Sequence, residues 1–300
     1  MKTWCRSKVL AAVGSAAIAL VVAQADAITP IKEFLFDEPA GFNALNTGSS
    51  STLAPALEMI KNTNGVENLN NSHGLGVAGG GLDQSFVDGS TSGQAQDTGG
   101  GNNFAINDTN VNNLASFTLM GWMKRDGASV VGNERRIVYK SNGTAGFRLE
   151  GGESGSQDYL RLWVDGSTVL SGNAYSSVNE WTYFAVTYDG TIATNNVNFY
   201  IGTLSGGNSN AVLVNTTTLN QGTTDNNGDL FAVGGIAGGN ISRSFDGSLD
   251  VIRVFGSHTD NSGALSLSQI QVWQSDIPEP SIAMLFGVSG LLLWRVRRRE

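Results

Sequence analysis

The nucleophilic and metal-binding side chains of this chain are few, and their spacing argues against most hydrolytic chemistry. Nucleophilic catalysis needs a serine or cysteine beside a base. The sequence holds one cysteine, Cys5, and two histidines, His73 and His258, which lie far apart in polar stretches. Zinc needs a denser set of histidine and cysteine ligands than this. These residues therefore predict neither a nucleophilic hydrolase nor a zinc site.

Glycoside hydrolysis would need paired carboxylates that converge on one sugar bond. Glu150 and Asp158 flank a turn rich in Gly and Ser, and Glu33 with Asp37 does not alternate along one strand face. No Glu-x-Asp-x-Glu arrangement occurs in the sequence. We therefore expect a protein that is not an enzyme, with a glycosidase as the less favoured alternative.

Aromatic side chains offer a different chemistry, because sugar faces stack on rings while polar side chains bind the hydroxyl groups. Trp163 is the first candidate, since it alternates with the apolar residues Leu160, Leu162 and Val164 and lies near Arg161. Packing of the Trp163 ring inside a sheet is the alternative. Weaker candidates are Tyr159, Tyr175 and Tyr200.

The balance of acidic and basic residues restricts the classes of partner that this chain can bind. Residues 28–277 contain 11 Lys and Arg against 23 Asp and Glu, a net charge of −12. This excess of acid argues against nucleic acid as a partner, favours solubility and leaves carboxylates available for cations.

The first 27 residues have the parts of a secretory signal peptide. Basic residues precede an apolar stretch over 9–23, and Ala25 and Ala27 supply the small residues that a signal peptidase needs. We expect cleavage after Ala27, with Ala25 as the alternative. Cys5 would leave with the signal, so the mature chain would have no disulfide and would depend on its core, on metal ions or on both.

The last 24 residues combine an extended spacer, an apolar span and a basic stop. Pro278 and Pro280, on either side of Glu279, fix φ and remove backbone donors. The span over 282–294 would reach about 20 Å as a helix, short of the ~30 Å hydrocarbon core of a membrane. Long basic side chains can compensate for a short span and set its orientation, and here they are Arg295, Arg297, Arg298 and Arg299. We expect a single transmembrane helix with the N-terminus outside.

This order of Pro-Glu-Pro, short apolar helix and terminal arginines resembles the PEP-CTERM sorting signal of Gram-negative bacteria. The resemblance implies processing near Pro278, Glu279 and Pro280 by a membrane peptidase of the exosortase type. An ordinary anchor that is never cut is the alternative.

The region between these two segments has the pattern of a β-sandwich. Strand signals recur from residue 104 onward with turn residues between them, as at Ser141-Asn-Gly-Thr144 and at Asp165-Gly166. The segment Trp181 to Tyr188 is apolar on both faces, which predicts a central strand covered on both sides. Ser266 with Gln269 predicts a capping box before one short helix.

Residues 41–101 show less periodicity. They are rich in Gly, Ser, Asn and Thr, which predicts loop with isolated edge strands. The apolar pattern of the segment Leu53 to Ile60 also fits a short helix. The Gly74, Gly76 and Gly79 spacing is not a dinucleotide site, because no buried strand precedes it and no helix pattern follows.

The strand order resembles the laminin G-like, concanavalin A-like jelly-roll family. The resemblance rests on Phe34 to Glu38, Phe117 to Trp122, Trp181 to Gly190, Val197 to Ile201, Phe245 to Phe255 and Leu265 to Ile270. It implies an all-β antiparallel jelly-roll sandwich over residues 28–276, between a signal peptide at 1–27 and a sorting and anchor segment at 277–300.

The same resemblance implies a calcium site, carried over onto Asp37, Asp246 and Asp250. We expect Asp250 on the side of its strand that also carries Ile252 and Val254. The alternative is that these aspartates form turns or pair with Arg253 or Arg243.

Together these features predict a protein exported through the inner membrane, anchored by its C-terminus before processing, and then located at the cell surface or outside the cell. We expect it to bind a polysaccharide or another surface polymer. A purely structural matrix component is the alternative.

Overall fold

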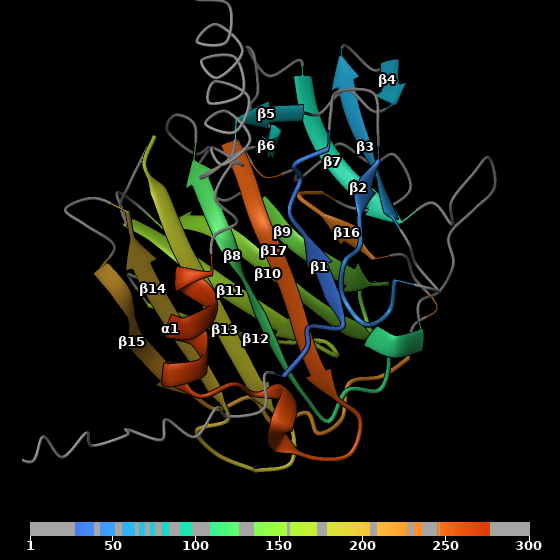
Figure 1. Cartoon of the computed structure of the whole chain (residues 1–300). Helices are drawn as coiled ribbons and strands as arrows, with labels where there is room; N and C mark the ends of the chain where they lie inside the picture. The colour runs from blue at the N-terminus through green and yellow to red at the C-terminus, as the bar shows by residue number, and fades with distance from the viewer. Residues whose placement is uncertain are drawn as a thin grey trace, which may run out of the picture.

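The computed structural model shows, among the residues that it describes, two antiparallel β-sheets packed face to face and a helix on the outer side of one sheet (Figure 1). It describes residues 28–38, 43–51, 56–63, 66–69, 73–75, 80–83, 91–97, 109–125, 135–154, 157–172, 179–204, 209–226, 228, 231–235, 245 and 247–276. The predicted signal peptide and the predicted sorting tail lie outside these residues. Among the described residues, no helix is both long enough and apolar enough to span a membrane.

Within the described residues, sheet A has eight strands in the order β15-β14-β13-β8-β17-β6-β5, with β1 also paired to β17. Its strands are β1 (Lys32–Phe34), β5 (His73–Leu75), β6 (Gly80–Asp83), β8 (Ser116–Arg125), β13 (Trp181–Asp189), β14 (Val197–Thr203), β15 (Ser209–Thr217) and β17 (Gly247–Ser257).

Sheet B, in the part of the chain that the structure describes, has nine strands in the order β12-β11-β10-β9-β16-β7-β3-β2, with β4 also paired to β3. Its strands are β2 (Ala44–Leu45), β3 (Ala56–Thr63), β4 (Val66–Leu69), β7 (Thr91–Asp97), β9 (Arg135–Ser141), β10 (Gly146–Ser154), β11 (Gln157–Val164), β12 (Ser167–Leu170) and β16 (Ala232–Val233). The described chain also has two 3₁₀ turns, Thr109–Val111 and Asn261–Gly263, and the helix α1 (Leu267–Ser275).

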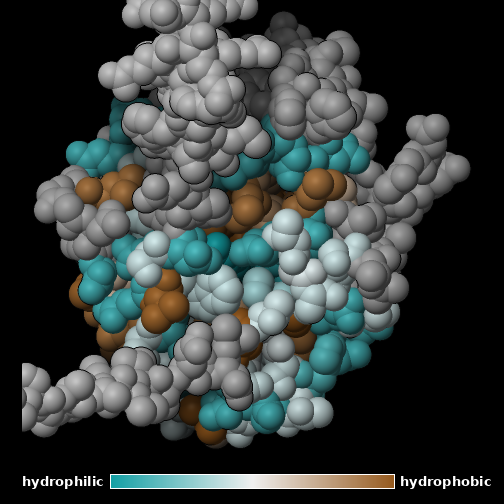
Figure 2. All heavy atoms as spheres, viewed as in Figure 1, coloured by the Kyte–Doolittle hydropathy of each residue, from teal (hydrophilic) through white to brown (hydrophobic). Residues whose placement is uncertain are grey.

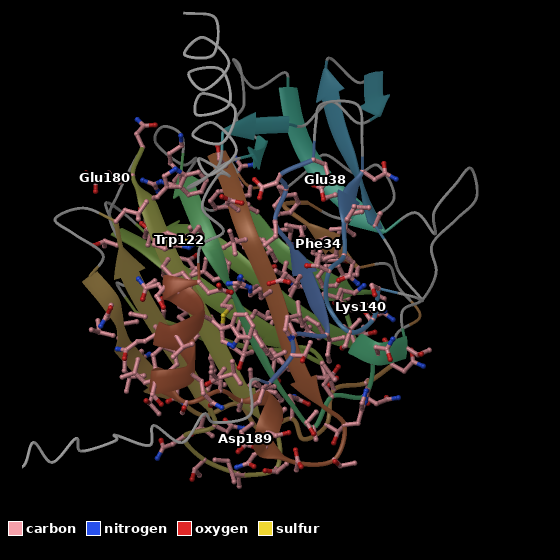
Figure 3. All side chains as sticks on the ribbon, in the orientation of Figure 1. Phe34, Glu38, Trp122, Lys140, Glu180 and Asp189 are labelled. Carbon is pink, nitrogen blue, oxygen red and sulfur yellow. The ribbon has the colours of Figure 1, made fainter. Side chains whose placement is uncertain are left out.

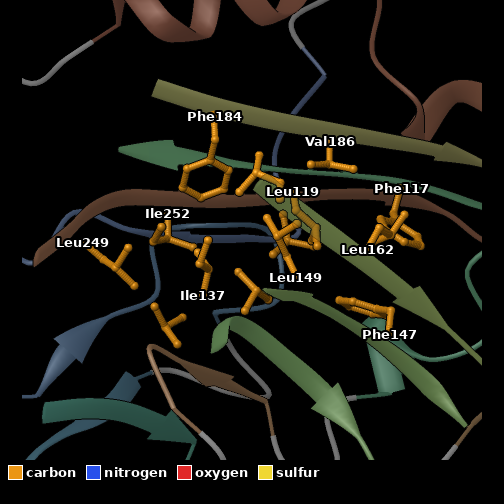
Figure 4. Close-up of a cluster of buried hydrophobic side chains, with 14 of the residues drawn as sticks. Phe117, Leu119, Ile137, Phe147, Leu149, Leu162, Phe184, Val186, Leu249 and Ile252 are labelled. Carbon is orange, nitrogen blue, oxygen red and sulfur yellow. The ribbon is translucent and has the colours of Figure 1, made fainter. Parts of the chain in front are cut away.

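The core lies between the two sheets. Alternate residues of a strand point to the same face, and in the strands whose side chains are described the inward positions carry large, buried apolar side chains. Figure 4 shows this layer, in which Phe117, Leu119, Phe184, Val186, Leu249 and Ile252 of sheet A face Ile137, Phe147, Leu149 and Leu162 of sheet B. The predicted all-β sandwich of antiparallel sheets is confirmed, and β13 is the predicted central strand.

The turn residues of two predicted hairpins fix how their strands pair in sheet B. Between β9 and β10, the Asn142 Oδ1 atom accepts hydrogen bonds from the backbone N–H groups of Thr144 and Ala145, each at 2.9 Å. Between β11 and β12, Asp165 and Gly166 have φ values of 42° and 85°, as a tight primed turn requires. Burial raises the pKa of the Asp165 carboxyl group, although backbone hydrogen bonds from Asp225 and Gly146 oppose the shift.

A β-bulge in β17 corrects one prediction. Asp250 pairs with Trp122 and Arg253 pairs with Met120, so two residues of β17 oppose one residue of β8. Val251 has φ of 49° at this point, a strained value for a β-branched residue. The extra residue turns Asp250 toward the outer face of sheet A, while Ile252 and Val254 stay in the inner core. The expectation that all three share one side was wrong, because the alternation breaks at the bulge.

The helix α1 covers the outer face of sheet A. The predicted capping box is present, since Ser266 and Gln269 bond each other's backbone N–H groups. Beneath α1 lies a second apolar cluster that includes Trp122, labelled in Figure 3, Tyr183 and Phe255. Burial raises the pKa of the Tyr183 phenol, whose hydroxyl donates toward the Ile270 carbonyl at 3.4 Å.

Arg253 fastens the end of α1 to the sheet. Its Nε atom donates to Glu33 of β1 at 2.7 Å. Its Nη1 atom donates to the carbonyl of Trp273 at 3.0 Å and its Nη2 atom to the carbonyl of Asp276 at 3.1 Å. Because Arg253 is almost wholly buried and its ion pair with Glu33 joins β17 to β1, one side chain ties the last described residue to the sheet.

The N-terminal third differs from its prediction. The segment expected to be helical near Ile60 belongs to the strand β3, which pairs with β7 and β4. Residues 41–101 contribute strands to both sheets, not only isolated edges. Long-range pairing outweighs the weak local pattern, since strand preference depends on cross-strand neighbours more than on the chain itself.

Truncating one inner side chain tests the core. We expect Leu149→Ala to lower the free energy of unfolding by about 2–5 kcal/mol, because it leaves a cavity between the sheets. Leu45→Ala is the matched control, since Leu45 is 54% exposed and its loss should stay within about 0.5 kcal/mol. Urea denaturation of both variants measures the difference, and equal midpoints would contradict this account of the core.

Candidate functional site

The outer face of sheet B carries a two-row set of arginine and aromatic side chains, which we call the arginine face. In the first row, Arg148 of β10 stands opposite Tyr139 of β9 and Trp163 of β11. In the second row, Glu150 of β10 stands opposite Arg136 of β9 and Arg161 of β11. The arginine face thus consists of Arg136, Tyr139, Arg148, Glu150, Arg161 and Trp163.

An irregularity in β9 brings Arg136 and Tyr139 onto the same face. The register shifts between Leu149 and Glu150, so that Leu149 pairs with Val138 and Glu150 with Arg136. Ile137 and Val138 are consecutive, yet both are buried in the inner core. A bulge places two successive side chains on one side of a strand, and the residues before and after them then share the outer face.

Glu150 is the centre of a buried ion cluster. Its Oε1 atom accepts a hydrogen bond from Nε of Arg148 at 2.6 Å. Arg136 and Arg161 also form ion pairs with Glu150. A buried carboxylate is costly unless it is paired, and three guanidinium groups here supply the compensation. The charges of these four described side chains sum to +2 among themselves, inside a chain whose sequence is acidic overall.

Aromatic rings interleave with these cations. The guanidinium carbon of Arg148 lies 4.3 Å from the centroid of the Trp163 ring, and that of Arg136 lies 5.9 Å from the Tyr139 ring. Such stacking is attractive because the ring face is electronegative. The Trp163 side chain is 4% exposed, whereas Arg148 and Arg161 reach the surface at 13% and 17%.

The sequence-predicted ligand residues therefore come together. Trp163 and Arg161 lie on one face, as their alternation with Leu160, Leu162 and Val164 predicts, and the ligand role of both stays a prediction. Tyr159 lies next along this face, opposite Gly152, where the ring occupies the space that a Cβ atom would fill. Tyr200 is buried under α1, and Tyr175 lies outside the described residues.

Of the carboxylates considered for glycoside hydrolysis, Glu150 and Asp158 do not converge. Asp158 forms an ion pair with Arg125 and alternates with Tyr159, which places it on the inner side of β11. Glu150 lies on the outer side, engaged by arginines through both oxygens. Hydrolysis needs two carboxyl groups that flank one bond, so this pair is not arranged for that reaction.

The residues considered for calcium are spread out. Asp37 is exposed after β1, and Asp250 is buried on the outer face of sheet A, where its Oδ1 atom accepts from the Val251 N–H at 2.8 Å. Asp246 lies outside the described residues. Within the described ranges, no group of three or more His, Cys, Asp or Glu side chains is arranged to hold a metal ion. Because Asp246 is not described, calcium at these aspartates stays a prediction.

The other predicted site residues lie outside the described part of the chain. They are the cleavage residues Ala25 and Ala27, the sorting motif Pro278, Glu279 and Pro280, and the basic stop Arg295, Arg297, Arg298 and Arg299.

Comparison with protein families agrees with the fold. A laminin G-type family model, described as the concanavalin A-like lectin/glucanases superfamily, matches residues 98–270. The chain belongs to this superfamily. The match begins near the start of the regular strand signals and ends within α1, so it includes the whole arginine face. No curated protein matches the sequence.

Solved structures with a similar arrangement share little sequence. Domain 4 of AbnA, a GH43 extracellular arabinanase from Geobacillus stearothermophilus, in complex with arabinotriose, has 12% identity and a TM-score of 0.48, covering 83% of this chain and 100% of that one. A structure of botulinum neurotoxin type C, described as dependent on two ganglioside molecules for cell entry, has 10% identity and a TM-score of 0.45, covering 83% and 51%. A heptameric SAP-like pentraxin from Limulus polyphemus has 16% identity and a TM-score of 0.35, covering 56% and 75%.

Sequence reasoning missed the contributions of β9 and β10 to the arginine face. The alternation in β11 points to Arg161 and Trp163, but their partners depend on a register that only the two hairpin turns fix. The signal that could have found Arg148 and Glu150 is their own alternation with Phe147 and Leu149 after the Asn142-Gly143 turn.

Neutralising the central carboxylate tests the ion cluster. We expect Glu150→Gln to lower the free energy of unfolding by about 3–5 kcal/mol, because it leaves buried guanidinium groups without their counter-charge. Glu180→Gln is the control, since Glu180 is exposed. Guanidinium chloride would screen the charges, so urea is the appropriate denaturant. If both variants unfolded at the same urea concentration, Glu150 would not hold the cluster together.

Proposed function

We propose that this protein is an exported, non-catalytic surface protein that binds an acidic polysaccharide on the arginine face. The observation that supports this function is the presence of three arginines, one carboxylate and two aromatic rings in two adjacent rows of the outer face of sheet B. Membership of a superfamily of lectins and glucanases makes a sugar polymer the natural class of ligand.

The chemistry of the arginine face favours an anionic sugar. A guanidinium group offers paired donors that match the two oxygens of a carboxylate or sulfate group. Arg148 and Arg161 carry this charge to the surface, while the bulk of the chain is acidic and would repel a polyanion elsewhere. The excess of positive charge in the cluster therefore gives both attraction and a defined position for binding.

The two ends of the sequence support export. We propose that the signal peptide is removed after Ala27 and that an exosortase-type peptidase cuts near Pro278, after the tail has held the protein in the inner membrane. Asp276 is the last residue with described contacts to the domain, and the Pro-Glu-Pro motif begins two residues later in the sequence.

Conservative replacement of one surface arginine tests binding. Arg161→Lys keeps the charge and loses the planar fork, and we expect roughly tenfold weaker binding of polygalacturonate, in line with the ~1.5–3 kcal/mol that a hydrogen bond to a charged group contributes. Lys124→Arg makes the reverse conservative exchange on β8 of sheet A and should leave affinity unchanged. Isothermal titration at two salt concentrations, with and without calcium and with neutral dextran as the comparison, provides the measurement.

Two results would count against this proposal. Equal affinity of Arg161→Lys and the unmodified protein would remove the arginine face as the binding site. Absence of saturable binding to either polymer would favour the alternative of a structural matrix component.

Processing is tested separately by intact-mass analysis of the protein recovered from the cell surface. We expect a chain that begins at Ile28 and ends near Pro278, well below the 31.5 kDa of the full sequence. Replacement of Pro278 and Pro280 by Ala should leave the tail attached, because the extended conformation before the apolar span is lost. Recovery of the uncut 31.5 kDa chain from the unmodified gene would overturn the proposal that both ends are cleaved.

A further inference from the structure

The turn between β9 and β10 contains an asparagine followed by a glycine, Asn142 and Gly143. Asn142 is exposed, and its Nδ2 group donates no hydrogen bond to the residues that the structure describes. Gly143 has φ of 94°, and no described atom beyond its chain neighbours lies within 4 Å of the place where a Cβ would stand. Because glycine has no Cβ atom, no side chain obstructs an approach of the Gly143 nitrogen to the Asn142 amide.

Three donors converge on the side-chain oxygen of Asn142. The Oδ1 atom accepts hydrogen bonds from the backbone N–H groups of Thr144 and Ala145 and from Oγ1 of Thr144, each at 2.9 Å. Donors fixed around a carbonyl oxygen stabilise the negative charge that develops there when a nucleophile attacks the carbonyl carbon. The folded turn therefore polarises the Asn142 amide toward attack.

The backbone nitrogen of Gly143 is polarised as well. Its N–H group donates to Oγ of Ser141 at 3.0 Å. An oxygen that accepts this hydrogen bond draws the proton and raises the electron density on the nitrogen. The turn thus holds a nucleophile, an activated amide and an exposed leaving group within consecutive residues.

We propose that Asn142 is a site of spontaneous deamidation, with water as the co-reactant. The Gly143 nitrogen loses its proton to water and bonds to Cγ of Asn142, the Cγ–Nδ2 bond breaks, and Nδ2 takes up a proton and leaves as ammonia. Water then opens the resulting cyclic imide at either of its carbonyl carbons. The product is aspartate, or isoaspartate in which the main chain runs through the former side-chain carbon.

The reaction replaces a neutral amide with a carboxylate between two strands of the arginine face. β9 supplies Arg136 and Tyr139 to this face, and β10 supplies Arg148 and Glu150. Isoaspartate also lengthens the main chain in the turn that joins these strands. An aged chain therefore carries one more negative charge on sheet B, and this charge would oppose an acidic polymer, a consequence that rests on the proposed function.

Mass spectrometry of the tryptic peptide Ser141–Arg148 follows the reaction directly, because trypsin cuts after Lys140 and after Arg148. The protein is purified from cells that express the full chain and is kept folded at neutral pH, and the amide, aspartate and isoaspartate forms are separated. We expect conversion at least ~3-fold faster in the folded protein than in a synthetic peptide of the same sequence, since only the folded turn fixes the donors.

A matched pair of variants tests the role of the donors. Thr144→Val removes the Oγ1 donor and keeps the backbone N–H, and we expect conversion to slow about fivefold, the factor that corresponds to the net free energy of one hydrogen bond. Thr168→Val makes the same exchange at an exposed threonine of β12 and should leave the rate unchanged. Thermal denaturation checks that both variants are folded.

The incubation requires a chain that stays in solution. Hydrophilic and near-neutral side chains predominate over hydrophobic ones on the face that carries α1 (Figure 2), and the net charge of −8 also opposes aggregation. No ligand is needed, so the result is independent of polymer binding. Conversion in the folded protein that is no faster than in the peptide would overturn the proposal, and so would equal rates for Thr144→Val and the unmodified chain.

Discussion

Face-to-face packing of the two sheets is the constraint on which the other features depend. Each strand alternates its side chains, so that once Phe147, Leu149 and Leu162 enter the inner core, the residues between them must face outward. Arg148, Glu150, Arg161 and Trp163 are therefore placed by the core and not by any ligand. The arginine face is a consequence of which residues fill the inward positions.

The outer faces of sheet A and sheet B carry different kinds of side chain. Sheet A is covered by α1, with a second apolar cluster beneath it and Arg253 fixing the end of the helix. Sheet B instead presents an ion cluster with rings between the guanidinium groups. An apolar face needs a covering element, whereas a buried carboxylate needs paired cations, and the two outer faces meet these two different needs.

Most of the fold could be predicted from the sequence, because strand alternation and turn residues are local signals. The hairpin turns at Asn142 and Asp165, the central strand at Trp181 and the capping box at Ser266 all follow from patterns within a few residues. Two things could not be predicted. The bulges at Val251 and at Ile137 reverse the alternation and depend on the neighbouring strand, and the strands of residues 41–101 are defined by partners far away in the sequence.

The same distinction applies to the candidate site and to the end of the domain. The positions of Trp163 and Arg161 can be predicted from one strand, while the ion pairs around Glu150 depend on the register of three strands.

At the end of the domain, Arg253 holds Trp273 and Asp276 through their backbone carbonyls, and backbone groups are present whatever the side chain. Cleavage near Pro278 would remove none of these hydrogen bonds, because Arg253, Trp273 and Asp276 all precede residue 277. The fastening of α1 to sheet A thus rests on residues that such a cleavage would leave in the chain.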